Sequence, residues 1–400
     1  MNKLQKAKDT INKWLYLNDD EWLDIIFACS LDRKIEGDPI WLLVIGVPSS
    51  SKTEILRTFK EGDDFYQLSM LTPNSFISGL TTDDGKGKNR MVQGLGEQVN
   101  GKTLILKDFT SILSTSKDKR DEIIGQLREF YDGSYSKKFG NFDKKITIHS
   151  RFGLLAGVTP KVDQYHSVMG ELGERFLKLR SDFDDDEMLN KCDENEGKEV
   201  QMRKEMSNAV MDFVNNFKPR NVTISKEHRK EIKKAGQFIA KIRAPNTTRR
   251  LGNEVVEYQP PKEENSPRVY KQLLKLTKLL CCIYGLDEPN KMIIRRVWRV
   301  AYDSSPPDRL RVYKAILNEK NTLNLTETHT RARIPKTTTR DILNILREVG
   351  LVKGMYQDSD TNEYWINKTY TPLASSCDIV TETSHRYIPK VNKEELVTSE

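Results

Sequence analysis

The sequence contains few cysteines, and none of them has the spacing of a metal site. The five cysteines are Cys29, Cys192, Cys281, Cys282 and Cys377. Zinc sites are typically built from closely spaced pairs of cysteine or histidine ligands, and these positions form no such pattern. The pattern is instead typical of a protein with reduced cysteines, so we expect a cytoplasmic location.

Long hydrophobic runs are also missing. No apolar stretch reaches the roughly 20 residues that a transmembrane helix needs, and residues 1–17 form an amphipathic basic segment without the apolar core of a signal peptide. We therefore expect no membrane association. We find no internal repeats either. The formal net charge of +7, with 31% charged residues, permits a polyanionic partner without requiring one.

The strongest functional pattern lies at residues 41–60, WLLVIGVPSSSKTEILRTFK. Trp41–Ile45 predicts a buried strand that ends at Gly46, and Ile55 and Leu56 begin a segment with helical spacing after a polar loop. A strand, a loop that ends in Lys-Thr and a helix form the context of a phosphate-binding P-loop. The nucleotide-binding residues that we expect are Gly46, Val47, Pro48, Ser49, Ser50, Ser51, Lys52 and Thr53.

Each part of such a loop has a defined role. The backbone N–H groups point at an anion. Lys52 would bring a mobile positive charge to the β- and γ-phosphates of ATP, and the Thr53 hydroxyl would complete the shell of a Mg²⁺ ion. Ser51 stands where the pattern GxxxxGK[ST] has its second glycine. A serine fits there only if its backbone dihedrals are not reserved for glycine, and we interpret Ser51 as a tolerated variant.

A carboxylate follows the next apolar strand. Thr103–Leu106 predicts a short buried strand, and Asp108 comes two residues later. P-loop enzymes use such an acid to hold Mg²⁺ or to orient the attacking water. The usual Asp-Glu pair is absent, so two assignments stay open. In the first assignment, Asp108 is the metal-side acid and the polarising glutamate comes from elsewhere, for example Glu129. In the second, Lys107 replaces the metal-side acid and Asp108 orients the water.

Two further residues are candidates for contact with the γ-phosphate. Thr159 ends the strand predicted at residues 151–158, which we expect beside the P-loop strand. Its hydroxyl can contact the γ-phosphate or the attacking water. Arg175 lies in GELGERFLKLR at residues 170–180. We expect it on a helix that faces away from its own site, where it can reach the γ-phosphate of a neighbouring subunit as an arginine finger.

The order of these features resembles that of AAA+ ATPases. It is most similar to the minichromosome-maintenance helicases and their relatives in bacterial mobile elements and phages. LKDF at residues 106–109 resembles the family's IDEF motif, LLAGVTP at residues 154–160 its sensor-1 strand, and GERF at residues 173–176 its arginine-finger motif. The resemblance covers residues 41–284 and departs from the family pattern at Ser51, Lys107 and Thr159.

The resemblance implies an Mg-ATP-dependent DNA motor, a helicase or translocase that serves replication of a mobile element or phage. It also implies a closed head-to-tail ring, expected to be a hexamer, with single-stranded DNA in its pore. SKKFG at residues 136–140 resembles the family's pore hairpin, which makes Lys137 and Lys138 candidate DNA contacts. SPRVYKQLLKLTKLL at residues 266–280 resembles the sensor-2 helix and would place Arg268 at the nucleotide.

Residues 308–368 are predicted to form a winged-helix domain, with three helices and a strand–turn–strand wing. The first turn of a recognition helix carries the groove contacts, which here would be contacts to duplex DNA. Asp358 and Asp360 at the wing tip would repel phosphates, so docking to a protein stays an alternative. The candidate DNA contacts at the start of the third helix are Lys336, Thr338 and Arg340.

The sequence thus predicts an α/β fold, in which a three-layer AAA+ P-loop core with a parallel sheet precedes an α-helical lid and a C-terminal winged helix. We expect a polar loop at residues 81–90 and an acidic surface connector at residues 181–199. Two other functions stay open, namely an ATP-switched DNA-binding regulator or helicase loader, and a signalling or defence ATPase. The predicted boundaries are an N-terminal helical segment at 1–40, the core at 41–180, the lid at 181–305, the winged helix at 306–368 and a flexible tail at 369–400.

Overall fold

The chain divides into two compact units. The first contains Met1–Ile224 and Lys271–Pro289, and the second contains Ser225–Tyr270 and Asn290–Glu400. This division differs from the predicted boundaries, because the segment predicted as a lid is shared between both units. The computed structural model describes residues 2–17, 19–77, 81–83, 89–91, 94–138, 145–165, 174–181, 185–245, 247–251, 254–317, 322–355 and 363–372.

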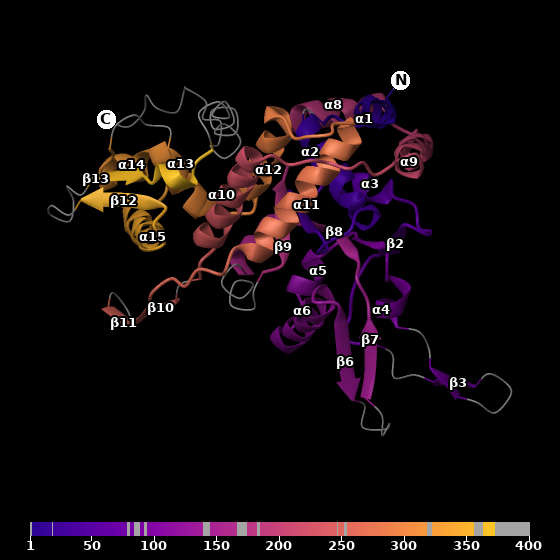
Figure 1. The fold of residues 1–400 in the computed structure, drawn as a ribbon, viewed down its shortest axis with the longest axis horizontal. Helices are drawn as coiled ribbons and strands as arrows, with labels where there is room; N and C mark the ends of the chain where they lie inside the picture. The colour runs from indigo at the N-terminus through magenta and orange to yellow at the C-terminus, as the bar shows by residue number, and fades with distance from the viewer. Residues whose placement is uncertain are drawn as a thin grey trace. The chain divides into compact units, whose positions relative to one another are not determined.

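A five-stranded sheet forms the centre of the first unit (Figure 1). The strands lie in the order β2-β5-β8-β1-β9, and every neighbouring pair is parallel. The carboxyl ends of parallel strands meet at one edge, so the loops after β1, β5 and β8 lie close together. The predicted α/β class with a parallel sheet is confirmed. The strands are β1 (Trp41–Ile45), β2 (Phe65–Leu68), β5 (Thr103–Leu106), β8 (Gly153–Val158) and β9 (Phe176–Arg180).

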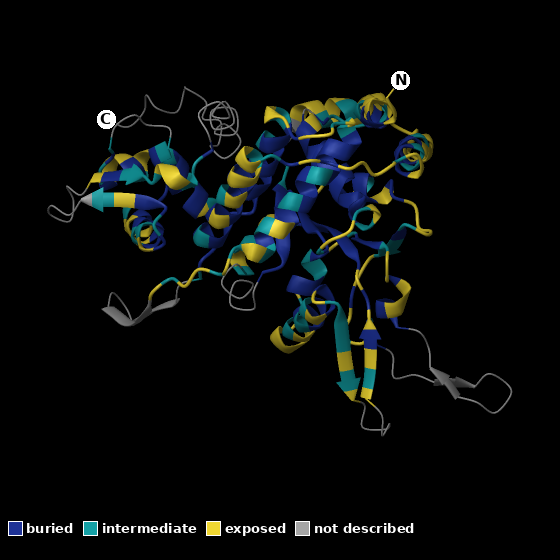
Figure 2. Ribbon diagram, in the orientation of Figure 1, coloured by how far each residue is buried: buried dark blue, intermediate teal, exposed yellow. Residues whose placement is uncertain are grey.

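Helices cover this sheet, and its central strands are buried along their whole length (Figure 2). Such burial on both faces explains why these strands have continuous rather than alternating apolar sequences. On one face, α4 (Leu95–Gln98), α5 (Thr110–Leu113) and α6 (Lys117–Tyr131) share a core cluster with alternate strand residues. Helices α2 (Asp20–Ser30) and α3 (Lys52–Arg57) also pack against β8.

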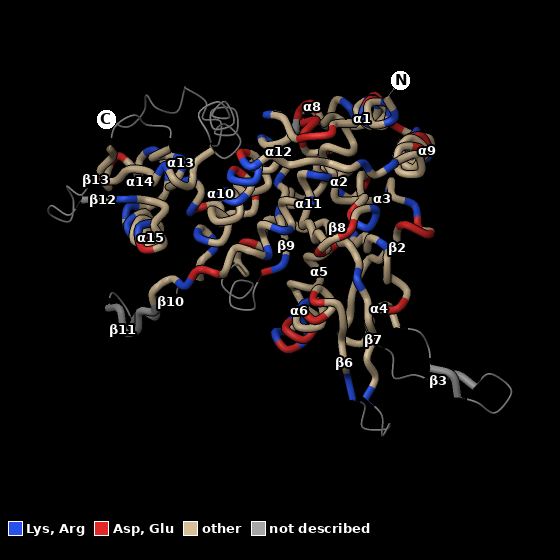
Figure 3. The backbone as a smooth tube through the Cα atoms, in the orientation of Figure 1, with Lys and Arg blue, Asp and Glu red and all other residues tan. Residues whose placement is uncertain are grey.

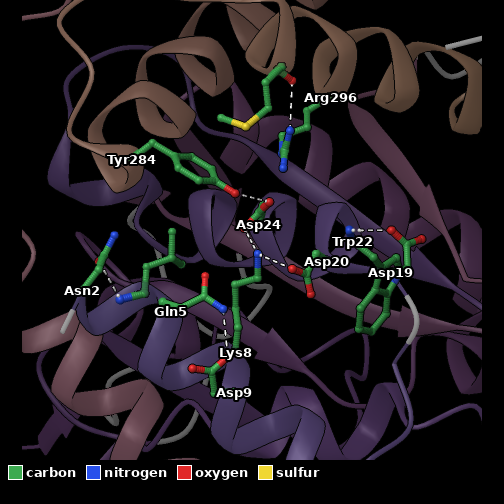
Figure 4. Close-up of polar contacts among 12 residues, drawn as sticks. Asn2, Gln5, Lys8, Asp9, Asp19, Asp20, Trp22, Asp24, Tyr284 and Arg296 are labelled. Atoms are coloured by element: carbon green, nitrogen blue, oxygen red, sulfur yellow. Dashed lines mark hydrogen bonds and ion pairs between the residues drawn. The ribbon is translucent and has the colours of Figure 1, made fainter. Parts of the chain in front are cut away.

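The N-terminal helices are fixed to this unit by a buried charge network (Figure 4). Helix α1 (Lys3–Trp14) carries Lys8, whose Nζ lies 3.2 Å from Oδ1 of Asp24 on α2. Oδ2 of Asp24 accepts a hydrogen bond of 2.6 Å from the hydroxyl of Tyr284, at the end of α11 (Pro267–Tyr284). The Asp24 side chain is fully buried, so this carboxylate ties three helices together. The end of α1 is therefore held in a defined position.

Three segments of the first unit differ from the expectations. The described parts of residues 81–90 are not a loop, because β3 (Thr81–Asp83) pairs antiparallel with β4 (Asn89–Met91). The expected acidic connector contains helix α8 (Asp185–Glu194), followed by α9 (Glu199–Asn215). Arg175 is not on a helix but directly precedes β9, since the apolar residues that follow it are buried in the sheet.

The second unit is mainly helical. Its helices are α10 (Lys226–Ile242), α12 (Lys291–Asp303), α13 (Pro307–Leu317), α14 (Leu325–Ala332) and α15 (Lys336–Glu348). The aromatic rings of Phe238, Trp298, Tyr302 and Tyr313 pack together in its core, with centroids 5.1–6.0 Å apart.

Strand pairs complete this unit. Strand β10 (Thr247–Leu251) pairs antiparallel with β11 (Glu254–Gln259), and β12 (Val352–Met355) with β13 (Glu363–Ile366). Three helices and two strands therefore occupy residues 308–368 in the predicted order. The expected wing tip with Asp358 and Asp360, and residues 373–400 of the expected tail, lie outside the described residues. Within the described ranges, no helix is long and apolar enough to cross a bilayer.

Candidate functional site

The loop after β1 begins at a glycine that is closely surrounded by side chains. A Cβ atom on Gly46 would lie 2.2 Å from Oγ of Ser181 and 2.6 Å from Oγ of Ser50. Ser181 directly follows β9, and its N–H donates to the carbonyl oxygen of Ile45 at 2.9 Å. The end of β9 therefore packs against the start of the loop, and this close approach needs a residue without a side chain.

Two serines of the loop have a left-handed backbone. The φ angles of Ser49 and Ser51 are 64° and 56°. Ser51 directly precedes α3, at the position where the P-loop pattern has glycine. Ser51 is therefore not an unstrained replacement for glycine. Glycine adopts a left-handed backbone easily, whereas other residues adopt it at a cost of about 1–2 kcal/mol. The loop retains serine there in spite of the strain.

Replacing Ser51 by glycine should increase the free energy of unfolding by about 0.5–1 kcal/mol. The substitution removes the left-handed strain, and the greater freedom of glycine in the unfolded chain offsets part of the gain. Denaturant unfolding of Ser51→Gly, compared with wild type, measures the effect. Ser51→Ala is the matched control, because alanine keeps the Cβ atom and should not be stabilising. Equal stability of the two variants would show that Ser51 is not strained.

The side chain of Lys52 folds back onto the loop. Its Nζ donates to the carbonyl oxygens of Gly46 and Val47 at 2.7 and 2.5 Å, and to Oγ of Ser50 at 2.8 Å. Burial lowers the pKa of Lys52 to about 8, and the nearby charge of Asp108 opposes this shift. The ammonium group thus lies in the centre of the loop, within the field of the acid predicted to act with it.

Asp108 and Thr159 are joined by a residue that the sequence analysis missed. The backbone N–H of Thr110 donates to Oδ1 of Asp108 at 2.8 Å, and Oγ1 of Thr110 accepts from the N–H of Thr159 at 3.0 Å. The hydroxyls of Thr110 and Thr159 are 3.4 Å apart. A threonine at the start of α5 could have been noticed as a capping residue, but its contact with Thr159 depends on the sheet.

The register of the sheet explains how these residues come together. Val158 pairs with Ile45 across β8 and β1, so Thr159 follows the strand beside the loop, as expected. The N–H of Phe109 donates to the carbonyl oxygen of Gly157 at 2.7 Å, which brings the end of β5 against β8. Lys52, Asp108 and Thr159 therefore share one edge of the sheet. Glu129, the glutamate considered as a partner of Asp108, is exposed on α6.

Arg175 lies at the other edge of the sheet. Phe176 pairs with Trp41 at the start of β1, so Arg175 is at the amino edge of the sheet, whereas the loop follows the carboxyl end of β1. Only 7% of the residue is exposed. Its Nη2 lies 3.0 Å from Oδ2 of Asp132, and its carbonyl oxygen accepts from Nε2 of Gln272 at 2.8 Å. Asp132 follows the last residue of α6, two residues before the hairpin formed by β6 (Ser134–Lys138) and β7 (Lys145–His149).

A second arginine near the loop was not predicted. Arg180 is opposite Ile45 in the sheet, and its guanidinium donates two hydrogen bonds, of 2.8 and 2.7 Å, to the carboxylate of Asp163. Asp163 lies four residues after Thr159, in a short 3₁₀ helix. This two-point contact is geometrically specific and fixes the segment that follows Thr159 against the end of β9.

A cavity of about 300 Å³ lies beside the loop. The loop forms one wall, and the end of α1, α8 and α9 form the others. Several of the wall residues away from the loop are apolar or aromatic, whereas the loop side is polar. The lining residues are Trp14, Leu15, Tyr16, Ser49, Ser50, Ser51, Lys52, Thr53, Glu54, Met188, Lys191, Cys192, Asn195, Glu199 and Met202.

Helix α9 fixes these walls to the loop. Arg203 donates to both carboxylate oxygens of Glu54 at 2.9 and 3.0 Å. Glu54 directly follows Thr53 of the loop. Glu205 accepts hydrogen bonds from Nε1 of Trp14 at 2.9 Å and from Nζ of Lys13 at 2.6 Å. Burial would raise the pKa of Glu54, but the hydrogen bonds and charge of Arg203 lower it overall. These contacts therefore hold α1 and α9, two walls of the cavity, in fixed positions within the first unit.

The predicted basic hairpin is formed by β6 (Ser134–Lys138) and β7 (Lys145–His149). Lys138 pairs directly with Lys145, and both are exposed. Figure 3 shows blue Lys and Arg positions at the far ends of β6 and β7. Like charges opposite one another destabilise a strand pair, so an anion at this position would be favourable. Nζ of Lys137 lies 3.4 Å from Oε1 of Glu122. Phe139 and Gly140 lie outside the described residues.

The remaining predicted contacts belong to the second unit. Nη1 of Arg268 is 3.6 Å from Oε2 of Glu264. Lys336, Thr338 and Arg340 lie in the first turn of α15, where Thr338 and Arg340 are exposed and Lys336 is half-buried.

The described ranges contain no group of three or more His, Cys, Asp or Glu side chains that could hold a metal ion by themselves. No protein-family model and no curated protein matches this chain. Its function is therefore inferred from the geometry of the loop, the cavity and the neighbouring strand ends.

Proposed function

We propose that this protein is an Mg-ATP-dependent ATPase of the AAA+ type that works as a DNA motor. The observation that carries the proposal is the cavity, which has the loop at residues 49–54 as a wall. The loop lies at the sheet edge that also carries Asp108 and Thr159. A cavity of this kind at the carboxyl edge of a parallel sheet is a common place for a nucleotide.

The residues of this edge match the needs of phosphoryl transfer. Lys52 would exchange its contacts with the loop carbonyls for the β- and γ-phosphates, which it neutralises. Thr53 is exposed at the start of α3, where its hydroxyl can join the oxygen shell of Mg²⁺. A bound Mg²⁺ ion would neutralise the charge that develops on the phosphates. The residues are thus suited to bind ATP and to stabilise its hydrolysis.

Asp108 and Thr159 would act on the attacking water. The Thr110 N–H holds one oxygen of the Asp108 carboxylate, which leaves the other free to orient a water molecule or a metal-bound water. The Thr159 hydroxyl lies beside Thr110 at the end of the adjacent strand. A positioned acid and a positioned hydroxyl at one edge provide the orientation that phosphoryl transfer requires.

The position of Arg175 supports the proposal of a ring of subunits. In its own chain this arginine lies at the sheet edge away from the loop, so it can complete only a neighbour's site. A head-to-tail ring repeats one such contact until it closes, and we expect a hexamer.

The DNA proposal rests on charge. The second unit contains 29 Lys and Arg residues against 20 Asp and Glu, so the basic excess of the whole chain lies there. Exposed Thr338 and Arg340 at the start of α15 suit contact with a phosphate backbone. The opposed Lys138 and Lys145 of the hairpin suit single-stranded DNA in a pore.

Single-stranded DNA should stimulate the ATPase, and Lys138→Ala should remove most of the stimulation while leaving the basal rate unchanged. The substitution removes a phosphate contact at the hairpin and touches nothing at the loop. Steady-state ATPase rates with and without DNA, beside a size measurement in ATP, test both parts. Lys119→Ala, an exposed lysine on α6, is the control. Unchanged stimulation in Lys138→Ala would exclude the hairpin as the DNA contact.

A second function remains a candidate because the acid motif is reduced. Asp108 is flanked by Lys107 and Phe109 rather than by a second acid. A weak hydrolase of this kind could serve as an ATP-switched DNA-binding regulator or helicase loader. A strand-displacement assay with and without ATP separates the two functions, since only a motor releases the displaced strand.

A further inference from the structure

We propose that Asn195 selects the nucleobase in the cavity, and that its Oδ1 accepts a hydrogen bond from the 6-amino group of a purine. This inference rests on the proposed function, because it concerns the base of the nucleotide whose phosphates bind the loop. It goes beyond the loop pattern, which recognises phosphates and is indifferent to the base. Asn195 follows α8 and lines the cavity.

The orientation of the Asn195 side chain is fixed by its own contacts. Nδ2 donates to the carbonyl oxygen of Trp14 at 3.1 Å and to that of Lys191 at 2.9 Å. Both partners are acceptors, so the amide must present its NH₂ group to them, and a flipped amide would place oxygen against oxygen. The carbonyl Oδ1 is then left as an acceptor, and no described residue donates to it.

Three other polar side chains of the cavity wall have contacts of their own. Glu54 is held by Arg203, and Nζ of Lys191 lies 2.6 Å from Oε2 of Glu194. Oε1 of Glu199 accepts from the N–H of Gly197 at 3.3 Å. Asn195 therefore offers the acceptor with the best-defined position away from the loop.

The apolar part of the cavity fits a planar base. Leu15, Met188 and Met202 line the same cavity, and methionine adapts well to the face of an aromatic ring. Adenine carries an amino group at C6, which donates to Oδ1. Hypoxanthine and guanine carry a carbonyl oxygen there, which would face Oδ1 as a second acceptor. A polar group without its partner is a strong basis for discrimination.

The test is displacement of a ribose-labelled fluorescent ATP analogue by ATP, ITP or GTP, with Mg²⁺ present. We expect wild type to bind ATP at least 10-fold more tightly than ITP and GTP. Asn195→Ala should reduce this preference to less than threefold, mainly through weaker ATP binding. Asn190→Ala is the matched control, because Asn190 is exposed on α8, the helix that directly precedes Asn195, and does not line the cavity.

The possible outcomes separate the inference from the proposed function. Equal binding of ATP and ITP to wild type would overturn the role of Asn195 and leave the proposed ATPase intact. Tighter binding of GTP than of ATP would mean that Oδ1 accepts from the 2-amino group of guanine, and it would overturn the selection of adenine. Failure of every nucleotide to displace the probe, or of the probe to bind, would overturn the proposed function itself. Retention of the 10-fold preference for ATP in Asn195→Ala would likewise overturn the role of Asn195.

Discussion

Lys52→Ala should lower the rate of ATP hydrolysis by at least about 100-fold, since it removes a charged donor from the transferred phosphates. The three donors of the ammonium group lie against Gly46, Val47 and Ser50, at the centre of the loop. No other described lysine has this position. Steady-state phosphate release measures the loss. A near-normal rate in this variant would disprove the proposed ATPase site.

Two comparisons make the Lys52 experiment specific. Lys60→Ala removes an exposed lysine from the same unit, whose Nζ contacts Asn208 at 3.0 Å, and should hydrolyse ATP at the wild-type rate. Thermal unfolding of Lys52→Ala should remain close to that of wild type, because Ser50 lines the cavity and Val47 is exposed, so water can replace the ammonium group. Loss of activity together with loss of the fold would point to a structural role for Lys52.

The depressed pKa of Lys52 adds a pH signature to the same experiment. Burial lowers this pKa to about 8, so about half of the Lys52 side chains are uncharged at that pH in the free protein. Triphosphate binding favours the protonated form and must then take up a proton. Affinity for ATP should therefore be constant well below pH 8 and fall by up to about 10-fold per pH unit above it. Lys52→Arg should lack this decline.

Much of the sheet could be predicted from the sequence because its strands are short apolar runs that end at Gly, Asp or Thr. Trp41–Ile45 and Thr103–Leu106 have the predicted bounds in the structure. The same runs placed Lys52, Asp108 and Thr159 at one edge. These features depend on burial and on strand direction, and a local pattern of residues is enough to specify both.

The parts that could not be predicted depend on contacts between distant residues. Thr110 contacts Thr159 across 49 positions, and Gln272 contacts Arg175 across 97. Helix α8 was missed because its acidic sequence looks like a solvated connector. Its place as a cavity wall depends on tertiary contacts, among them the bond of Asn195 with Trp14. The dihedrals of Ser51 were also beyond the sequence, since serine rarely adopts a left-handed backbone.

Arg175→Ala should retain ATP binding and lose turnover by about 1,000-fold or more, the size of effect seen for arginine fingers. The guanidinium contacts Asp132 within its own chain at 3.0 Å, so it must leave this carboxylate to reach a neighbour's phosphate. The Asp132 side chain is 60% exposed and can be solvated once the arginine moves away. Probe binding and phosphate release, measured on the same sample, separate binding from turnover.

Mixing two inactive variants decides whether Arg175 acts on a neighbour. Arg175→Ala subunits keep an intact loop, and Lys52→Ala subunits keep an intact arginine. In a ring assembled at random from equal amounts, about one quarter of the sites would combine both intact parts, so activity should return to roughly that fraction. The double variant Lys52→Ala/Arg175→Ala, mixed with Lys52→Ala, should restore nothing. If mixed rings form but stay inactive, Arg175 acts within its own chain, where its contacts with Asp132 and Gln272 would join the hairpin to α11.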